Sequence, residues 1–134
     1  MLHNMARTQR QRRGAQAEDL AATYLTRLGW QVLARNVRVG RDEIDLLAVD
    51  PAPPPELVAV EVRSATTAAF GAPEERIDRA KVAHLYRGLS AAASALSGFP
   101  RAVGLLPRRV DLVLVDRRQG RTEFRHVRGL EPPG

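Results

Sequence analysis

Two carboxylates in neighbouring apolar segments are the side chains of this 134-residue chain best suited to chemistry. Asp45 lies in the segment 43–49 and Glu61 in the segment 57–62, and a proline-rich loop connects the two. If this loop is centred on Pro53, Asp45 faces Glu61 across an antiparallel pair, with Cβ atoms about 4.5–5.5 Å apart. Two carboxylates at that distance repel each other, which raises one pKa unless a cation lies between them.

Two kinds of cation could relieve this repulsion. Mg²⁺ and Mn²⁺ are hard ions that take oxygen ligands, so a pair of carboxylates suits them. Arg63 is the alternative, because the same register places it opposite Glu43 and near Glu61, where it would form a structural ion-pair network. The spacing alone leaves the metal site and the ion-pair patch equally open.

Side chains alternate between the two faces of a strand, which predicts the surroundings of these charges. The charged residues share one face, which becomes apolar toward the proline-rich loop, and the opposite face is apolar throughout. A shift of one residue would bury every charge, so the pattern determines the parity of the pairing. The charged face holds Glu43, Asp45, Glu61 and Arg63, and the apolar face holds Ile44, Leu46, Ala48, Val58, Val60 and Val62.

The elements that must position this hairpin follow from the periodicity of the remaining sequence. Apolar residues recur at helical spacing in two segments, and three further segments have the apolar, β-branched character of strands. The helices are expected at 14–28 and 74–97, and the further strands at 30–35, 109–116 and 122–127.

The element order is therefore α-β-β-β-α-β-β. Short connections among the first three strands imply an antiparallel meander, and the long helix before the fourth strand implies a parallel crossover. The sequence predicts an α/β fold with a central mixed sheet flanked by helices. It divides into a flexible basic arm (1–13), a single domain (14–129) and a loose tail (130–134).

Composition excludes several function classes. The chain has no cysteine, so disulfides, thiol nucleophiles and cysteine-ligated metal centres are ruled out. The net charge is +6, which favours a polyanionic partner, although the excess is almost wholly arginine and also fits GC-rich coding. No secretory signal or stretch of about 18 apolar residues is present, which predicts a cytoplasmic protein that does not enter membranes.

Several motifs, taken in order, resemble a known family. The run D-E-I-D-L-L at 42–47 and V-E-V-R at 60–63 resemble the PD-(D/E)xK nuclease core. More closely, the chain resembles the YraN-like family of predicted endonucleases, which are distantly related to archaeal Holliday junction resolvases. The resemblance covers about residues 14–129, and its other pieces are G-A-Q-A-E-D-L-A at 14–21, A-R-N-V-R at 34–38, Lys81, R-V-D-L-V at 109–113 and a late R-H-V.

The resemblance implies a restriction-endonuclease-like core and a metal-dependent DNA endonuclease, with branched or recombination intermediates as substrates. Asp45 and Glu61 would bind Mg²⁺ or Mn²⁺, joined by the backbone carbonyl of Val62 and, through a water, by Glu18. The ion would polarise the phosphate and lower the pKa of the attacking water. Related resolvases act as dimers, so a homodimer is an open expectation here.

One departure from the family pattern bears directly on catalysis. The motif lysine is Arg63 in this chain, and arginine keeps the positive charge but cannot act as a base. Lys81, the only lysine, could supply the missing ammonium, or it could be a solvated helix residue. A nucleic-acid-binding protein without catalysis is therefore the alternative function, and a protein–protein adaptor is a weaker one.

Arginines outside the hairpin are the candidate contacts to nucleic acid, because guanidinium groups pair with phosphates. They lie in the N-terminal arm and around the turn that precedes the Asp45 strand. The candidates are Arg10, Arg12, Arg13, Arg38 and Arg41.

Overall fold

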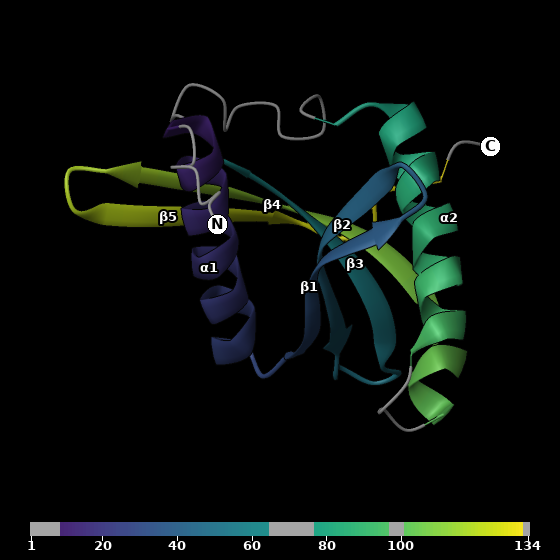
Figure 1. The fold of residues 1–134 in the computed structure, drawn as a ribbon. Coiled ribbons are helices and arrows are strands. Elements are labelled where there is room, and N and C mark those ends of the chain that lie inside the picture. The colour runs from purple at the N-terminus through teal and green to yellow at the C-terminus, as the bar shows by residue number, and fades with distance from the viewer. Residues whose placement is uncertain (1–8, 65–76, 97–100, 133–134) are drawn as a thin grey trace, which may run out of the picture.

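The computed structural model contains one five-stranded sheet with a long helix on each side (Figure 1). It describes residues 9–64, 77–96 and 101–132. The element order confirms the predicted α-β-β-β-α-β-β, with a short 3₁₀ helix added before the fourth strand. In chain order the elements are α1 (Gln9–Arg27), β1 (Gln31–Val39), β2 (Asp42–Asp50), β3 (Glu56–Ser64), α2 (Arg79–Ala95), η3 (Arg101–Leu105), β4 (Arg108–Arg118) and β5 (Arg121–Val127).

The strands lie in the sheet in the order in which they follow one another in the chain, β1-β2-β3-β4-β5. β3 and β4 are parallel, and every other neighbouring pair is antiparallel. This is the predicted mixed sheet: short turns join the antiparallel neighbours, while the connection containing α2 carries the chain back to start a parallel strand. No helix in the described part of the chain is long and apolar enough to cross a membrane.

Both faces of the sheet are buried, each under one helix. Leu25 of α1 packs on one face with Leu46 and Val60, and Leu89 of α2 packs on the other with Leu57. Because both faces are covered, the central strands are almost continuously apolar. A charged side chain within them therefore stands out.

The register of the central hairpin is the one predicted by centring the loop on Pro53. Leu46 pairs with Val60 and Ala48 with Val58. The β2–β3 ladder ends at the Leu46–Val60 pair. On the side of this pair away from the proline-rich loop, the predicted alternation of side chains between the two faces of β2 is wrong. Ile44 packs in the core under α2, on the face opposite Leu46, so the predicted apolar face loses this residue.

Both long helices begin at a different residue from the one expected. α1 begins at Gln9, so residues 9–13 of the predicted flexible arm are helical, while residues 1–8 lie outside the described residues. α2 begins at Arg79 rather than at 74, because Asp78 caps it by accepting a hydrogen bond from the Lys81 N–H over 2.8 Å. Residues 74–76 of the predicted helix lie outside the described part of the chain.

The predicted loose tail is wrong at Leu130, which is buried. The Leu130 N–H donates to the Val110 carbonyl over 2.8 Å, and its own carbonyl accepts from the Tyr86 hydroxyl at the same distance. This residue therefore ties the end of the domain to the core under α2. Residues 133–134 lie outside the described residues.

Candidate active site

Asp45 and Glu61 meet where the β2–β3 ladder ends. The Asp45 Oδ2 accepts a hydrogen bond from the Val62 N–H over 2.8 Å, so the Asp45 side chain is directed toward β3. Glu61 is buried, with 5% of its surface exposed, and it lies next to Val62 in β3. The structure thus brings together the two carboxylates on which the sequence prediction rests.

The surroundings make the ionised form of Asp45 costly. Burial raises the pKa of Asp45 to about 8, and the neighbouring Glu61 carboxylate also raises it. The Val62 N–H opposes these effects, and the more distant Glu18 adds to them. Without a cation, the pair therefore retains a proton near neutral pH.

The two oxygens of the Glu61 carboxylate have different surroundings. Its Oε2 accepts from the Nε of Arg63 at 3.0 Å and lies 2.9 Å from the Nη2. Its Oε1 is buried and has no hydrogen-bond partner among the described residues. The Arg63–Glu61 part of the predicted ion-pair network is thus confirmed. The predicted register of Glu43 opposite Arg63 is not found, because the β2–β3 ladder ends at Leu46 and Val60, and Glu43 is paired in register with Arg38 of β1.

A second acidic pair lies beside the first and is bridged by an amide. With its nitrogen facing them, Asn36 of β1 donates to Glu18 Oε1 at 3.0 Å and to Glu43 Oε1 at 3.1 Å. Burial raises the pKa of Glu18, the Asn36 hydrogen bond opposes this, and Glu43 raises it again. Glu18 is therefore held near Asp45 by Asn36.

Sequence reasoning missed the role of Asn36, which it placed at the end of a strand. β1 continues through Asn36 to Val39, and Asn36 has a φ of 51°, a left-handed conformation that asparagine tolerates better than most residues. The A-R-N-V-R motif at 34–38 was the available signal.

The donor set suits a hard divalent ion. Two carboxylates, one with a buried oxygen that lacks a partner, are the oxygen ligands that Mg²⁺ and Mn²⁺ accept. Within the described residues, however, no three histidine or acidic side chains lie close enough together to form a metal site by themselves. A bound ion would thus need further ligands, such as a backbone carbonyl, water or phosphate.

Lys81 lies in the first turn of α2 and is partly exposed. Its backbone N–H donates to the side chain of Asp78, the N-cap residue of α2. Its ammonium forms no ion pair with a described carboxylate. The structure does not bring Lys81 into contact with Asp45 or Glu61. Its predicted catalytic role stays a prediction, as does that of the Val62 carbonyl.

The predicted nucleic-acid contacts lie on α1 and around the β1–β2 turn. Arg12, Arg38 and Arg41 are exposed, and Arg38 lies 4.0 Å from Glu43. Arg10 and Arg13 belong to α1, but their side chains lie outside what the structure describes.

A second charged cluster, which the sequence did not predict, lies toward the opposite end of the sheet. Asp111 is fully buried and accepts hydrogen bonds from Arg109, from His126 and from the Gly129 N–H. Arg109 also pairs with Asp50 at 3.0 Å. Since every one of these carboxylate contacts is to a protein donor, this cluster is a structural network.

Fold and site together define a mixed α/β protein with an acidic pair at the end of the central hairpin of its sheet. The chain belongs to the uncharacterised protein family UPF0102, whose family model matches residues 17–115. This confirms the expected YraN-like family.

Relatives from several organisms match between about half and nearly all of the chain. A UPF0102 protein of Nocardioides sp. (strain JS614) is 35% identical over 131 residues, 97% of this chain and 99% of the relative. One from Arthrobacter sp. (strain FB24) is 36% identical over 118 residues, 87% of this chain and 93% of the relative. One from Persephonella marina is 43% identical over 70 residues, 52% of this chain and 58% of the relative.

Proposed function

We propose that this protein is a divalent-metal-dependent endonuclease that hydrolyses phosphodiester bonds in DNA. The observation that supports it is the Asp45–Glu61 pair, in which two carboxylates meet at the end of a hairpin and one buried oxygen, Glu61 Oε1, has no partner among the described residues. Burying such an oxygen without a hydrogen bond or a cation is unfavourable, so it is expected to have a partner in the working protein.

Mg²⁺ or Mn²⁺ is the proposed partner. Asp45 and Glu61 would hold the ion, with the Val62 carbonyl as a further ligand and Glu18 acting through a water. A bound ion supplies Lewis-acid polarisation of the scissile phosphate and lowers the pKa of a water that attacks it. The Val62 N–H orients Asp45, and Asn36 orients Glu18.

Arg63 would contribute binding rather than proton transfer. Its guanidinium donates a hydrogen bond to Glu61 Oε2. Because 37% of the Arg63 side chain is exposed, the guanidinium can also contact a phosphate. A guanidinium stays protonated at neutral pH, so Arg63 cannot take a proton from water. The substrate class, DNA with branched or recombination intermediates, and a homodimer are proposed from the resemblance to resolvases. A cytoplasmic location is also proposed.

The test is cleavage of labelled DNA by the purified chain. Linear duplex, single-stranded, flap and four-way-junction DNA are incubated with Mn²⁺, with Mg²⁺ and with EDTA. Wild type is expected to cut at least one substrate with a divalent ion, and Asp45→Asn and Glu61→Gln are expected to lose at least 100-fold in rate. Glu131→Gln, an exposed carboxylate outside the site, is the matched control and should cut normally. Cleavage that survives in the site variants would overturn the assignment.

The second candidate is a nucleic-acid-binding protein without catalysis. The ion pair of Arg63 with Glu61 favours it, because a guanidinium already neutralises part of the acidic pair. This candidate predicts salt-sensitive DNA binding with no product under any metal.

A further inference from the structure

The hairpin formed by β4 and β5 projects beyond the end of β3 (Figure 1). The last residue of β3, Ser64, pairs with Val115, whereas β4 continues to Arg118 and pairs with β5 up to Arg121. The turn at 119–120 therefore has no neighbour in β3. Beside this turn, Arg117 of β4 donates a hydrogen bond to Gln16 of α1 over 2.6 Å.

This projecting turn lies at the same end of the sheet as the acidic pair. Glu61 pairs with Leu112 of the parallel strand β4, and Arg118 lies six residues further along. At about 3.3 Å per residue, the turn is about 20 Å from the level of Glu61. The two are therefore separated by about six base pairs of duplex rise, since successive phosphates on one strand lie about 3.4 Å apart along the axis.

The β1–β2 turn reaches out at this end as well, on the other side of the pair. β1 runs parallel to β3, so its last residue, Val39, lies toward the same end as Ser64. Asp42 beside this turn is 3.4 Å from His84 of α2, whereas the β4–β5 turn lies against α1. The two turns thus diverge toward opposite helices (Figure 1). Asp45 of β2 and Glu61 of β3 lie on the two strands between β1 and β4.

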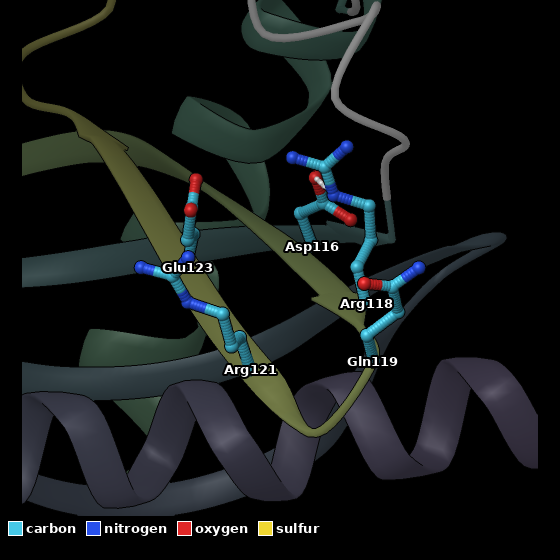
Figure 2. Close-up of a pocket in the computed structure, with 5 residues that line it drawn as sticks. All are labelled: Asp116, Arg118, Gln119, Arg121 and Glu123. Atoms are coloured by element: carbon cyan, nitrogen blue, oxygen red, sulfur yellow. Dashed lines mark ion pairs between the residues drawn. The ribbon is translucent and has the colours of Figure 1, made fainter.

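Charge on the hairpin is predominantly positive where it is exposed. Arg117, Arg118, Arg121 and Arg125 are all exposed, against one exposed carboxylate, Glu123. Figure 2 shows Arg118 and Arg121 extending from the two strands around a hollow at the turn, which Gln119 and Glu123 also line. Asp116, which also lines the hollow, is itself buried and lies 3.5 Å from Arg118.

The same charges disfavour a protein strand as the partner of this edge. β5 is the outer strand of the sheet, and its exposed residues include Arg121, Glu123 and Arg125. Charged side chains along an outer strand are a common means of preventing pairing with another chain. Guanidinium groups on a narrow two-stranded arm instead suit the evenly spaced phosphates of a nucleic acid.

We infer that the β4–β5 hairpin is a DNA-binding arm that contacts the phosphate backbone of a duplex lying across the acidic pair, with the β1–β2 turn contacting it on the other side. The inference rests on the proposed function for the class of ligand, double-stranded DNA. It assigns to Arg118 and Arg121 a positioning role: they place the duplex and do not touch the reacting phosphate.

Duplex binding in EDTA tests the arm without requiring cleavage. The affinity of the full chain for a fluorescent duplex of about 30 base pairs is measured by anisotropy at several salt concentrations between about 50 and 200 mM. Arg118→Gln/Arg121→Gln is compared with Arg108→Gln/Arg128→Gln, which removes the same charge from exposed positions at the opposite end of the sheet, where Arg128 lies 3.8 Å from Asp50. The arm variant should bind about tenfold more weakly, with a salt slope shallower by about 2, since each phosphate contact contributes about 0.9.

Equal duplex affinity of the two double variants would overturn the inference that the hairpin binds DNA. A wild-type chain that binds no duplex would overturn it as well. Failure of the proposed function gives a different result: if the chain binds duplex DNA through the arm but cleaves none, the DNA-binding arm stands and the endonuclease activity does not. Because the chain has no cysteine, Gln119→Cys can also carry a single iron chelate that cleaves nearby DNA. Cuts at one location on the duplex are expected from position 119 and none from Arg108→Cys, at the far end of β4; the reverse would also overturn the inference.

Discussion

The Val62 N–H donates to the Asp45 carboxylate over 2.8 Å, so the last hydrogen bond between β2 and β3 is made by a side chain rather than by the backbone. The backbone pairing ends one residue earlier, at Leu46 and Val60. Because the carboxylate takes the position of a strand partner, it is fixed in direction and lies close to Glu61. The hairpin thus builds its acidic pair at the point where its own ladder stops.

Asp45→Asn is expected to stabilise the metal-free protein at high pH. Burial and Glu61 raise the pKa of Asp45 in the folded chain to about 8, above its ordinary value of 3.8. Between these values the folded state holds a proton that the unfolded state lacks, so wild-type stability falls as pH rises from about 4 to 8 and is level above that range. The variant escapes this loss while its amide oxygen still accepts from Val62.

Thermal unfolding in EDTA at pH 5, 7 and 9 measures this effect. The advantage of the variant should grow by about 2–4 kcal/mol across the range, since one pKa unit corresponds to about 1.36 kcal/mol. A variant that is less stable than wild type by the same amount at every pH would contradict the raised pKa.

Asn36→Asp is expected to destabilise the fold and lower activity. Aspartate also tolerates the φ of 51°, but it replaces the amide that donates to Glu18 and Glu43 with a third carboxylate. The loss should be about 1–3 kcal/mol at pH 8 and smaller at pH 4, where the carboxylates gain protons. Urea unfolding at the two pH values checks this, and a loss that does not depend on pH would point to backbone strain instead.

Asp111→Ala is expected to lower the free energy of unfolding more than Asp45→Asn or Asn36→Asp does, and to leave the Asp45–Glu61 pair unchanged. It leaves the guanidinium of Arg109 and the ring of His126 without their shared buried partner, which costs about 3–5 kcal/mol. The exposed Asp19, which pairs with Arg35, is the control, and its alanine variant should lose no more than about 1 kcal/mol. Equal losses would show that the buried network contributes no more than a surface pair.

Much of this architecture could be predicted from the sequence, because the strongest signals are local. The proline-rich loop and the alternation around it determined the pairing of Leu46 with Val60, and the long helix between β3 and β4 determined the parallel crossover. The site was predicted to the level of the Asp45–Glu61 pair for the same reason.

What could not be predicted depends on contacts between distant segments. Ile44 lies on the α2 face, and the neighbouring Asp45 accepts a hydrogen bond from the Val62 N–H of β3. Strict period-two alternation does not predict such an irregularity. Asn36 gains its role only when α1 brings Glu18 beside β1 and β2 brings Glu43. The burial of Asp111 likewise depends on Arg109, which sequence alone suggests is solvated.

Arg63→Lys separates a weak nuclease from a protein that only binds. A lysine ammonium is smaller than the guanidinium that now holds Glu61 Oε2, and it can be tuned toward proton transfer. If the scaffold is catalytic, the rate of DNA cleavage with Mn²⁺ should rise by about tenfold or more, and Arg87→Lys, at an exposed position on α2, should change nothing. No product from wild type or from Arg63→Lys would favour the binding-only function.

The central claim, that Asp45 and Glu61 hold a divalent ion, is tested most directly by titrating the protein with Mn²⁺ at pH 8 and counting bound ions by electron paramagnetic resonance. The account predicts one site per wild-type chain, retained in Glu131→Gln and lost in Asp45→Asn and in Glu61→Gln, all of which remain folded. The same number of bound ions in wild type and Asp45→Asn, or no bound ion in wild type, would contradict it.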